Sequence, residues 1–220
     1  MTYEQVEKQV LQLLNQYTVA GAPVAESYNN QKDYLLRIPG LVNDAMMEIA
    51  TTVKKIQEVV DLDTLSCEVI GDKLRYELPE DFYQFKTGDT FVTVMDDGRM
   101  LHTNRYSIQG RNYMLVPRDE VDSGAFHTIT YYRYPHLLSD KPDADEELDN
   151  TVDTHFAIPY YVAAFLVIHD DNFQFASFYN KYEDKLQKMS PGLSVEMTQA
   201  SDASGGVFVH DGYGMGYIWG

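Results

Sequence analysis

The sequence IPYYVAAFLVIHDDNFQFASFYNKYEDKL, residues 158–186, decides what kind of fold the chain can adopt. Its first eleven residues are apolar on every side, and the part after His169 is amphipathic and rich in aromatic residues. A helix that is apolar all round has to be covered all round by other elements. We therefore predict one long helix over 158–189, with Pro159 in its first turn, that lies inside a helical bundle.

The apolar beginning of this helix is a candidate surface both for core packing and for contacts between subunits. Its nominally outward positions are apolar as well. Two helices and a sheet of the same chain could cover it, and a neighbouring subunit could do so equally well. We name this candidate surface the helix collar, and its residues are Tyr160, Ala163, Phe165 and Leu166.

The cluster His169-Asp170-Asp171-Asn172 in the middle of the stretch raises the question of a metal or catalytic site. Consecutive helical residues diverge by about 100°, whereas ligands of one ion need i, i+3 or i, i+4 spacing. We therefore expect Asp171 and Asn172 to hydrogen-bond to neighbouring groups where two helices cross. The six histidines form no known metal-binding pattern, and nucleotide-binding glycine motifs are absent. We predict no catalytic, cofactor-binding or metal-binding residue and no cofactor.

The charge of the chain limits its partners. Its 17 basic and 34 acidic residues give a net charge of −17. Nucleic-acid affinity comes largely from lysine and arginine, so tight or sequence-specific DNA binding is not expected. A single cysteine, Cys67, cannot form a disulfide framework. The N-terminus lacks the features of a signal peptide, and the apolar run 156–168 is too short to span a bilayer. We expect a chain that folds in a reducing cytoplasm and does not associate with a membrane.

The rest of the chain predicts two further helices and a β region. Helical spacing of apolar residues predicts helices over 3–17 and 39–60, separated by a loop over 18–32. Between them and the long helix, the period changes to that of strands, and we expect one compact antiparallel sheet of about four to six strands. The expected strands are 73–78, 91–95, 113–116 and 126–134, with turns at Pro79-Glu80-Asp81, Asp97-Gly98 and Gln109-Gly110.

These elements predict an α+β fold, mainly a helical bundle with a small inserted antiparallel sheet and an extended C-terminal arm. Residues 139–153 carry seven acidic residues, and we expect a solvated connection there. The predicted divisions are a helical bundle over 1–62 and 154–189, an inserted β domain over 63–138, the acidic connection over 139–153, and the arm over 190–220.

The arm carries an unusual amount of apolar surface for a free tail. Aromatic residues of this kind are typical anchors at protein interfaces. We predict that the arm docks into a groove on another protein, the alternative being that it folds back on its own domain. The candidate docking residues are Phe208, Tyr213, Tyr217, Ile218 and Trp219.

Four segments carry a resemblance to a known family. They are RIPGLVNDAMMEIA (37–50), YELPEDFYQF (76–85), ITYYRYPHLL (129–138) and the stretch from ELDN to EDKL (147–186). Their order and spacing resemble the head–tail connector, or adaptor, proteins of tailed bacteriophages. The resemblance covers about 37–189 and leaves out 1–36 and 190–220.

The resemblance implies a non-enzymatic virion protein at the head–tail junction. Such proteins assemble as a ring, typically dodecameric, beneath the portal protein. The arm would then reach the portal, other surfaces would meet a neck or tail protein, and genomic DNA would pass through the lumen without sequence-specific binding. The acidic surface is consistent with a channel that does not grip DNA.

Two other functions remain open at this point. The first is another structural role in a phage tail, such as tail completion or the baseplate, with the arm docked on a tail protein. The second is a carbohydrate-binding or hydrolytic module that uses aromatic residues of the β region as a sugar platform. The residues of that platform would be Tyr106, Tyr113, Tyr131, Tyr132 and Tyr134, although packing between neighbouring strands also accounts for them.

Overall fold

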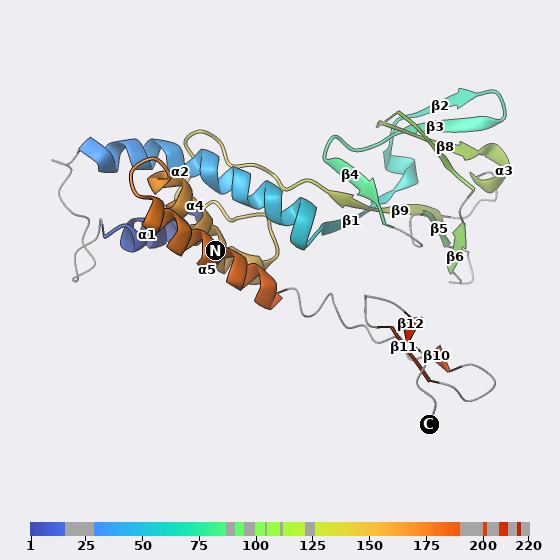
Figure 1. The fold of residues 1–220 in the computed structure, drawn as a ribbon. Helices are drawn as coiled ribbons and strands as arrows, with labels where there is room; N and C mark the ends of the chain where they lie inside the picture. The colour runs from blue at the N-terminus through green and yellow to red at the C-terminus, as the bar shows by residue number, and fades with distance from the viewer. Residues whose placement is uncertain are drawn as a thin grey trace. The chain divides into compact units, whose positions relative to one another are not determined.

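The chain divides into two compact units, one mainly helical and one mainly built of β-strands (Figure 1). The computed structural model describes residues 1–15, 29–86, 91–94, 100–103, 105–110, 112–121, 126–189, 200–201, 207–210 and 215–216. The helical unit comprises Met1–Val42, Asp143–Asp145 and Val152–Gly220, and the β unit comprises Asn43–Pro142 and Glu146–Thr151. The predicted mixed α+β fold is confirmed.

Helix α1 (Tyr3–Leu13) opens the helical unit. It begins with a capping box, in which the Thr2 hydroxyl accepts the N–H of Gln5 and the Gln5 side chain accepts the N–H of Thr2. The helix ends earlier than the predicted 3–17, because Asn15 adopts the left-handed conformation with φ of 57°. Residues 16 and 17 lie outside the described residues.

Helix α2 (Asn29–Glu48) differs from the predicted helix at both ends. It begins ten residues earlier than expected, so residues 29–32 are helical and Pro39 lies inside the helix. The remaining predicted loop residues, 18–28, are outside the described part. At the other end, a π-helical turn (Ile49–Val53) leads into strand β1 (Ile56–Asp61), so the prediction of helix up to residue 60 is wrong.

The reason for this early end is local. Residues 51–53 are all β-branched, which restricts their side chains in a helix. The hydroxyl of Thr51 donates to the carbonyl of Met47 at 2.8 Å, and that of Thr52 donates to Glu48 at 2.6 Å. Such back-bonding disturbs the helical hydrogen-bond ladder.

The predicted long helix over 158–189 is two helices, α4 (Ile158–Val167) and α5 (Asn172–Met189). Asp171 separates them, because its carboxylate accepts the N–H groups of Phe173 at 2.9 Å and Gln174 at 3.0 Å. This is the arrangement of a helix N-cap. The two helices pack against each other through aromatic rings, and α1 packs on α4. Figure 1 shows these elements together.

The described residues of the β unit form two antiparallel sheets, whereas the sequence predicted one. One sheet has the order β1-β9-β5-β6, with β4 also paired to β9, and the other has the order β2-β3-β8-β7. Gly110, at a predicted turn, has φ of 65°, while the Asp97-Gly98 turn lies outside the described residues. The remaining strands are β2 (Cys67–Ile70), β3 (Lys73–Glu77), β4 (Phe82–Phe85), β5 (Phe91–Val94), β6 (Met100–Thr103), β7 (Ser107–Gln109), β8 (Tyr113–Pro117) and β9 (Phe126–Arg133), and a short helix α3 (Arg118–Val121) follows β8.

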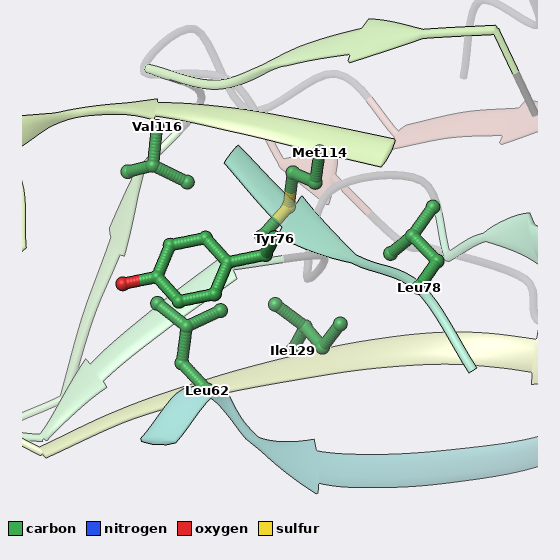
Figure 2. Packing of buried hydrophobic residues seen from close by; sticks show 6 residues of the cluster. All are labelled: Leu62, Tyr76, Leu78, Met114, Val116 and Ile129. Atoms are coloured by element: carbon green, nitrogen blue, oxygen red, sulfur yellow. The ribbon is translucent and has the colours of Figure 1, made fainter. Parts of the chain in front are cut away.

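The core of the β unit lies between the two sheets. Tyr76 on β3 is the cross-strand partner of Met114 on β8, so both side chains occupy one face. Ile129 on β9 comes from the other sheet. Figure 2 shows these side chains pointing into the shared interior. The cluster consists of Leu62, Tyr76, Leu78, Met114, Val116 and Ile129, all buried.

The described residues of the C-terminal segment 190–220 form three short strands. They are β10 (Ala200–Ser201), β11 (Val207–His210) and β12 (Met215–Gly216). They pair antiparallel in the order β10-β11-β12. The extended form of the arm stays a prediction.

We expect Met114→Ala to destabilise the β unit by about 2 to 4 kcal/mol, because it leaves a cavity in a closed core. The matched control is Val69→Ala on β2, which shortens an apolar side chain that is 60% exposed. Urea unfolding followed by circular dichroism measures both. Equal losses in the two variants would contradict the assignment of the core.

We expect Asp171→Ala to lower the free energy of unfolding by about 1 kcal/mol through loss of the N-cap of α5. Asp170→Ala is the control, because it removes the same charge one position before the cap. The same unfolding measurement compares them. If Asp170→Ala costs as much as Asp171→Ala, charge and not capping is responsible.

Candidate assembly surfaces

The helix collar is mostly interior. Ala163 and Leu166 on α4 are buried within the chain itself. Tyr160 and Phe165 are half-buried. Lys185 lies over the Tyr160 ring at 5.0 Å, and Phe165 packs against its neighbours on both helices. Any contact of the collar with a second copy therefore involves Tyr160 and Phe165, and that contact stays a prediction.

The predicted docking residues of the arm are only partly described. Phe208 lies on β11, where its backbone is the partner of Ala200 on β10. Tyr213, Tyr217, Ile218 and Trp219 lie outside the described residues. Their role in docking stays a prediction.

Sequence reasoning missed several exposed apolar side chains that are candidates for assembly contacts. In the helical unit, Phe173 on α5 is 83% exposed and Leu36 on α2 is 74% exposed. In the β unit, Val69 and Ile108 lie on the edge strands β2 and β7 of one sheet. Exposed apolar side chains mark a surface that another protein covers where they form a contiguous patch, so these residues are candidates and not assigned contacts. A helical-wheel projection of the sequence could have indicated that Phe173 is exposed, because it does not lie on the apolar face of α5.

Arg133 at the end of β9 is the centre of the main polar network. Its guanidinium is almost fully buried and donates to both carboxylate oxygens of Asp149, one of them at 2.8 Å. It also donates to Glu58 on β1 at 3.2 Å and to the carbonyl of Tyr134 at 3.0 Å. Paired donors of this kind are strong and geometrically specific. Hydrogen bonding to Asp149 raises the pKa of Arg133 further above its ordinary value, against the effect of burial.

The acidic connection over 139–153 is not simply solvated, which corrects the sequence prediction. Leu148 and Asn150 are buried, and the Asn150 side chain donates to the carbonyl of Met46 at 3.1 Å. Just before this segment, Asn43 exchanges two hydrogen bonds with the backbone of Leu138, at 2.9 and 2.8 Å. Polar side chains therefore fix the returning chain to the β unit. The acidic composition of this segment contains no signal that some of its residues are buried.

Asp149 has the clearest electrostatic signature of the connection. Burial raises the pKa of its carboxyl, but hydrogen bonds from Arg133 and from the backbone N–H of His136 outweigh this. The pKa of Asp149 falls from 3.8 to about 2 as a result. Nearby, the hydroxyl of Tyr131 donates to Asp81 at 3.1 Å, and burial together with Asp81 raises the pKa of this tyrosine.

The tyrosines of the proposed sugar platform do not share one exposed surface. Tyr131 is buried, and Tyr106 packs against Phe85 with ring centroids 5.4 Å apart. Arg75 lies over the ring of Tyr113 at 4.6 Å, and Tyr134 packs against Tyr83. Tyr132 lies beside Lys55. Packing within the β unit therefore accounts for them.

Neither a cluster of potential metal ligands nor a helix able to cross a membrane is found among the described residues. Within them, no group of three or more His, Cys, Asp or Glu side chains is placed to hold a metal ion. None of the described helices has both the length and the apolar character that crossing a bilayer requires. The cluster at 169–172 acts locally instead, with Asp171 as the cap of α5.

A protein-family model described as SU10 adaptor protein matches residues 1–207. The chain belongs to this family. Membership implies a structural, non-enzymatic role as a phage head–tail adaptor, and it confirms the resemblance to phage adaptors. The match also extends the resemblance, because it includes residues 1–36 and the beginning of the C-terminal segment. A comparison with curated proteins found no match.

We expect Asp149→Asn in this SU10 adaptor to lower the free energy of unfolding by about 2 kcal/mol at neutral pH. Because the folded-state pKa is depressed, the stabilisation is present above about pH 4 and is lost as the pH falls through about 2. The difference between parent and variant should therefore shrink with acidification. Unfolding measurements between pH 7 and pH 2.5 check this.

The control for that measurement is Asp140→Asn, which removes the same charge from an exposed position in the same segment. A pH-dependent loss of the same size in the control would assign the effect to net charge and not to the Arg133–Asp149 pair.

Proposed function

We propose that the chain is a neck protein that forms a ring beneath the portal and joins it to the tail. The observation that carries the proposal is the adaptor-family match over residues 1–207 of a 220-residue chain. In this role the protein makes three kinds of contact: with copies of itself, with the portal protein, and with a neck or tail protein. A dodecameric ring is the proposed assembly.

The arm over 190–220 is the proposed portal contact. Its aromatic residues suit an anchor that fills a groove on a partner, because Trp and Tyr bury much apolar area for little loss of conformational freedom. The half-buried Tyr160 and Phe165 of the helix collar are the proposed contact between subunits.

The ring is proposed to surround the passing genomic DNA. A net charge of −17 supports a wall that repels phosphate groups, because such a wall would not retain DNA during ejection. The chain therefore acts in the virion, at the head–tail junction, after synthesis in the host cytoplasm.

Quantitative mass spectrometry of purified phage particles tests this role. We expect the chain and the portal protein in near-equal copy number. We also expect a chain that ends after Ser204 to be absent from particles, because it lacks the anchor residues, while a chain that ends after Trp219 is incorporated normally.

Absence of the full-length chain from particles would overturn the proposal. Photo-cross-linking from position 219 separates the two phage roles. Cross-links to the portal support the neck position, and cross-links to a tail component alone would favour a tail-completion or baseplate protein.

A further inference from the structure

A pocket of about 460 Å³ opens in the β unit beside the turn that joins β3 to β4. This volume is within the range of sites that hold a small ligand or a large side chain. Its lining includes Glu77, Leu78, Pro79, Glu80, Tyr83 and Tyr134. These residues come from the end of β3, the turn, β4 and the residue that follows β9.

Backbone hydrogen bonds hold the pocket in shape. The N–H of Phe82 donates to the carbonyl of Pro79 at 3.0 Å, which closes the turn. The N–H of Tyr134 donates to the carbonyl of Asp81 at 2.8 Å. The N–H of Leu78 donates to the carbonyl of Asn112, also at 2.8 Å. Three separate chain segments are therefore locked together around the cavity.

The walls combine aromatic rings with carboxylates. The rings of Tyr83 and Tyr134 lie with their centroids 5.0 Å apart. Leu78 is buried and belongs to the core cluster shown in Figure 2, so this wall is rigid. Glu77 and Glu80 are both exposed, and within the described part of the chain neither has an ion-pair partner.

Two arginines that are close in sequence to pocket residues already have partners. Arg75, two residues before Glu77 on β3, pairs with Glu68 and lies over the Tyr113 ring at 4.6 Å. Arg133, next to Tyr134, is held by Asp149 and Glu58. Among the described residues, the two glutamates of the pocket therefore have no ion-pair partner.

We propose that this pocket accepts an arginine side chain from a basic segment of a partner protein. A guanidinium is planar, stacks on tyrosine rings and donates several hydrogen bonds to carboxylates at once. The pocket offers both features side by side. The inference goes beyond the role of neck protein, because it assigns a specific binding site and the chemistry of its occupant, and it stands whichever phage position the chain takes.

Titration of the full-length, ¹⁵N-labelled protein with L-argininamide tests the site. We expect saturable chemical-shift changes at the amides of Glu80, Tyr83 and Tyr134, with a Kd of about 1 mM. The double variant Glu77→Gln/Glu80→Gln should raise the Kd at least about tenfold, the equivalent of one lost charge-assisted contact.

The matched control is Glu147→Gln/Glu183→Gln, which removes two exposed carboxylates elsewhere and leaves the pocket intact. We expect it to bind argininamide as the parent does. An equal loss in both double variants would assign the binding to general attraction by an acidic surface and would overturn the proposal. Equally tight binding of the uncharged analogue citrullinamide, or absence of saturable shifts, would overturn it as well.

Discussion

The buried guanidinium of Arg133 imposes the constraint on which the β unit depends. A charge removed from water is tolerated only when it is paired, and breaking one partner leaves the other uncompensated. Arg133 satisfies this by joining Glu58 on β1 and Asp149 in the returning chain. Arg133 therefore links the strand pair β1–β9 to the segment 146–151. An acidic stretch that would otherwise be solvated becomes part of the folded unit.

The two-sheet arrangement follows from a second constraint, the need to cover the apolar face of each sheet. A single small sheet would leave its apolar face exposed to water, whereas two packed sheets cover each other's apolar faces. The cross-strand pair Tyr76–Met114 on one sheet faces Ile129 on the other. Apolar residues of this inner face continue outward to Val69 and Ile108 on the edge strands, where they contact water. The β unit thus has a closed interior and exposed apolar side chains on the edge strands of one sheet.

Local signals predicted the types of element, and contacts between distant residues decided the rest. Helical spacing and turn residues indicate most elements. Pro39, however, predicts the start of a helix and lies within α2. The apolar run before His169 concealed the break that Asp171 makes by capping α5. The division into two sheets depends on strand pairing, which alternation alone does not specify. The pocket at Glu77 and Tyr134 was equally invisible, because separate segments build it.

The rings shared by α4 and α5 have a consequence for how these helices align. Tyr161 meets Tyr182 edge to face with centroids 5.1 Å apart, and Phe165 meets Phe175 in the same manner at 5.8 Å. Such edge-to-face pairs depend on orientation, unlike contacts between aliphatic chains. The ring pairs therefore favour the alignment that α4 and α5 adopt along each other's length.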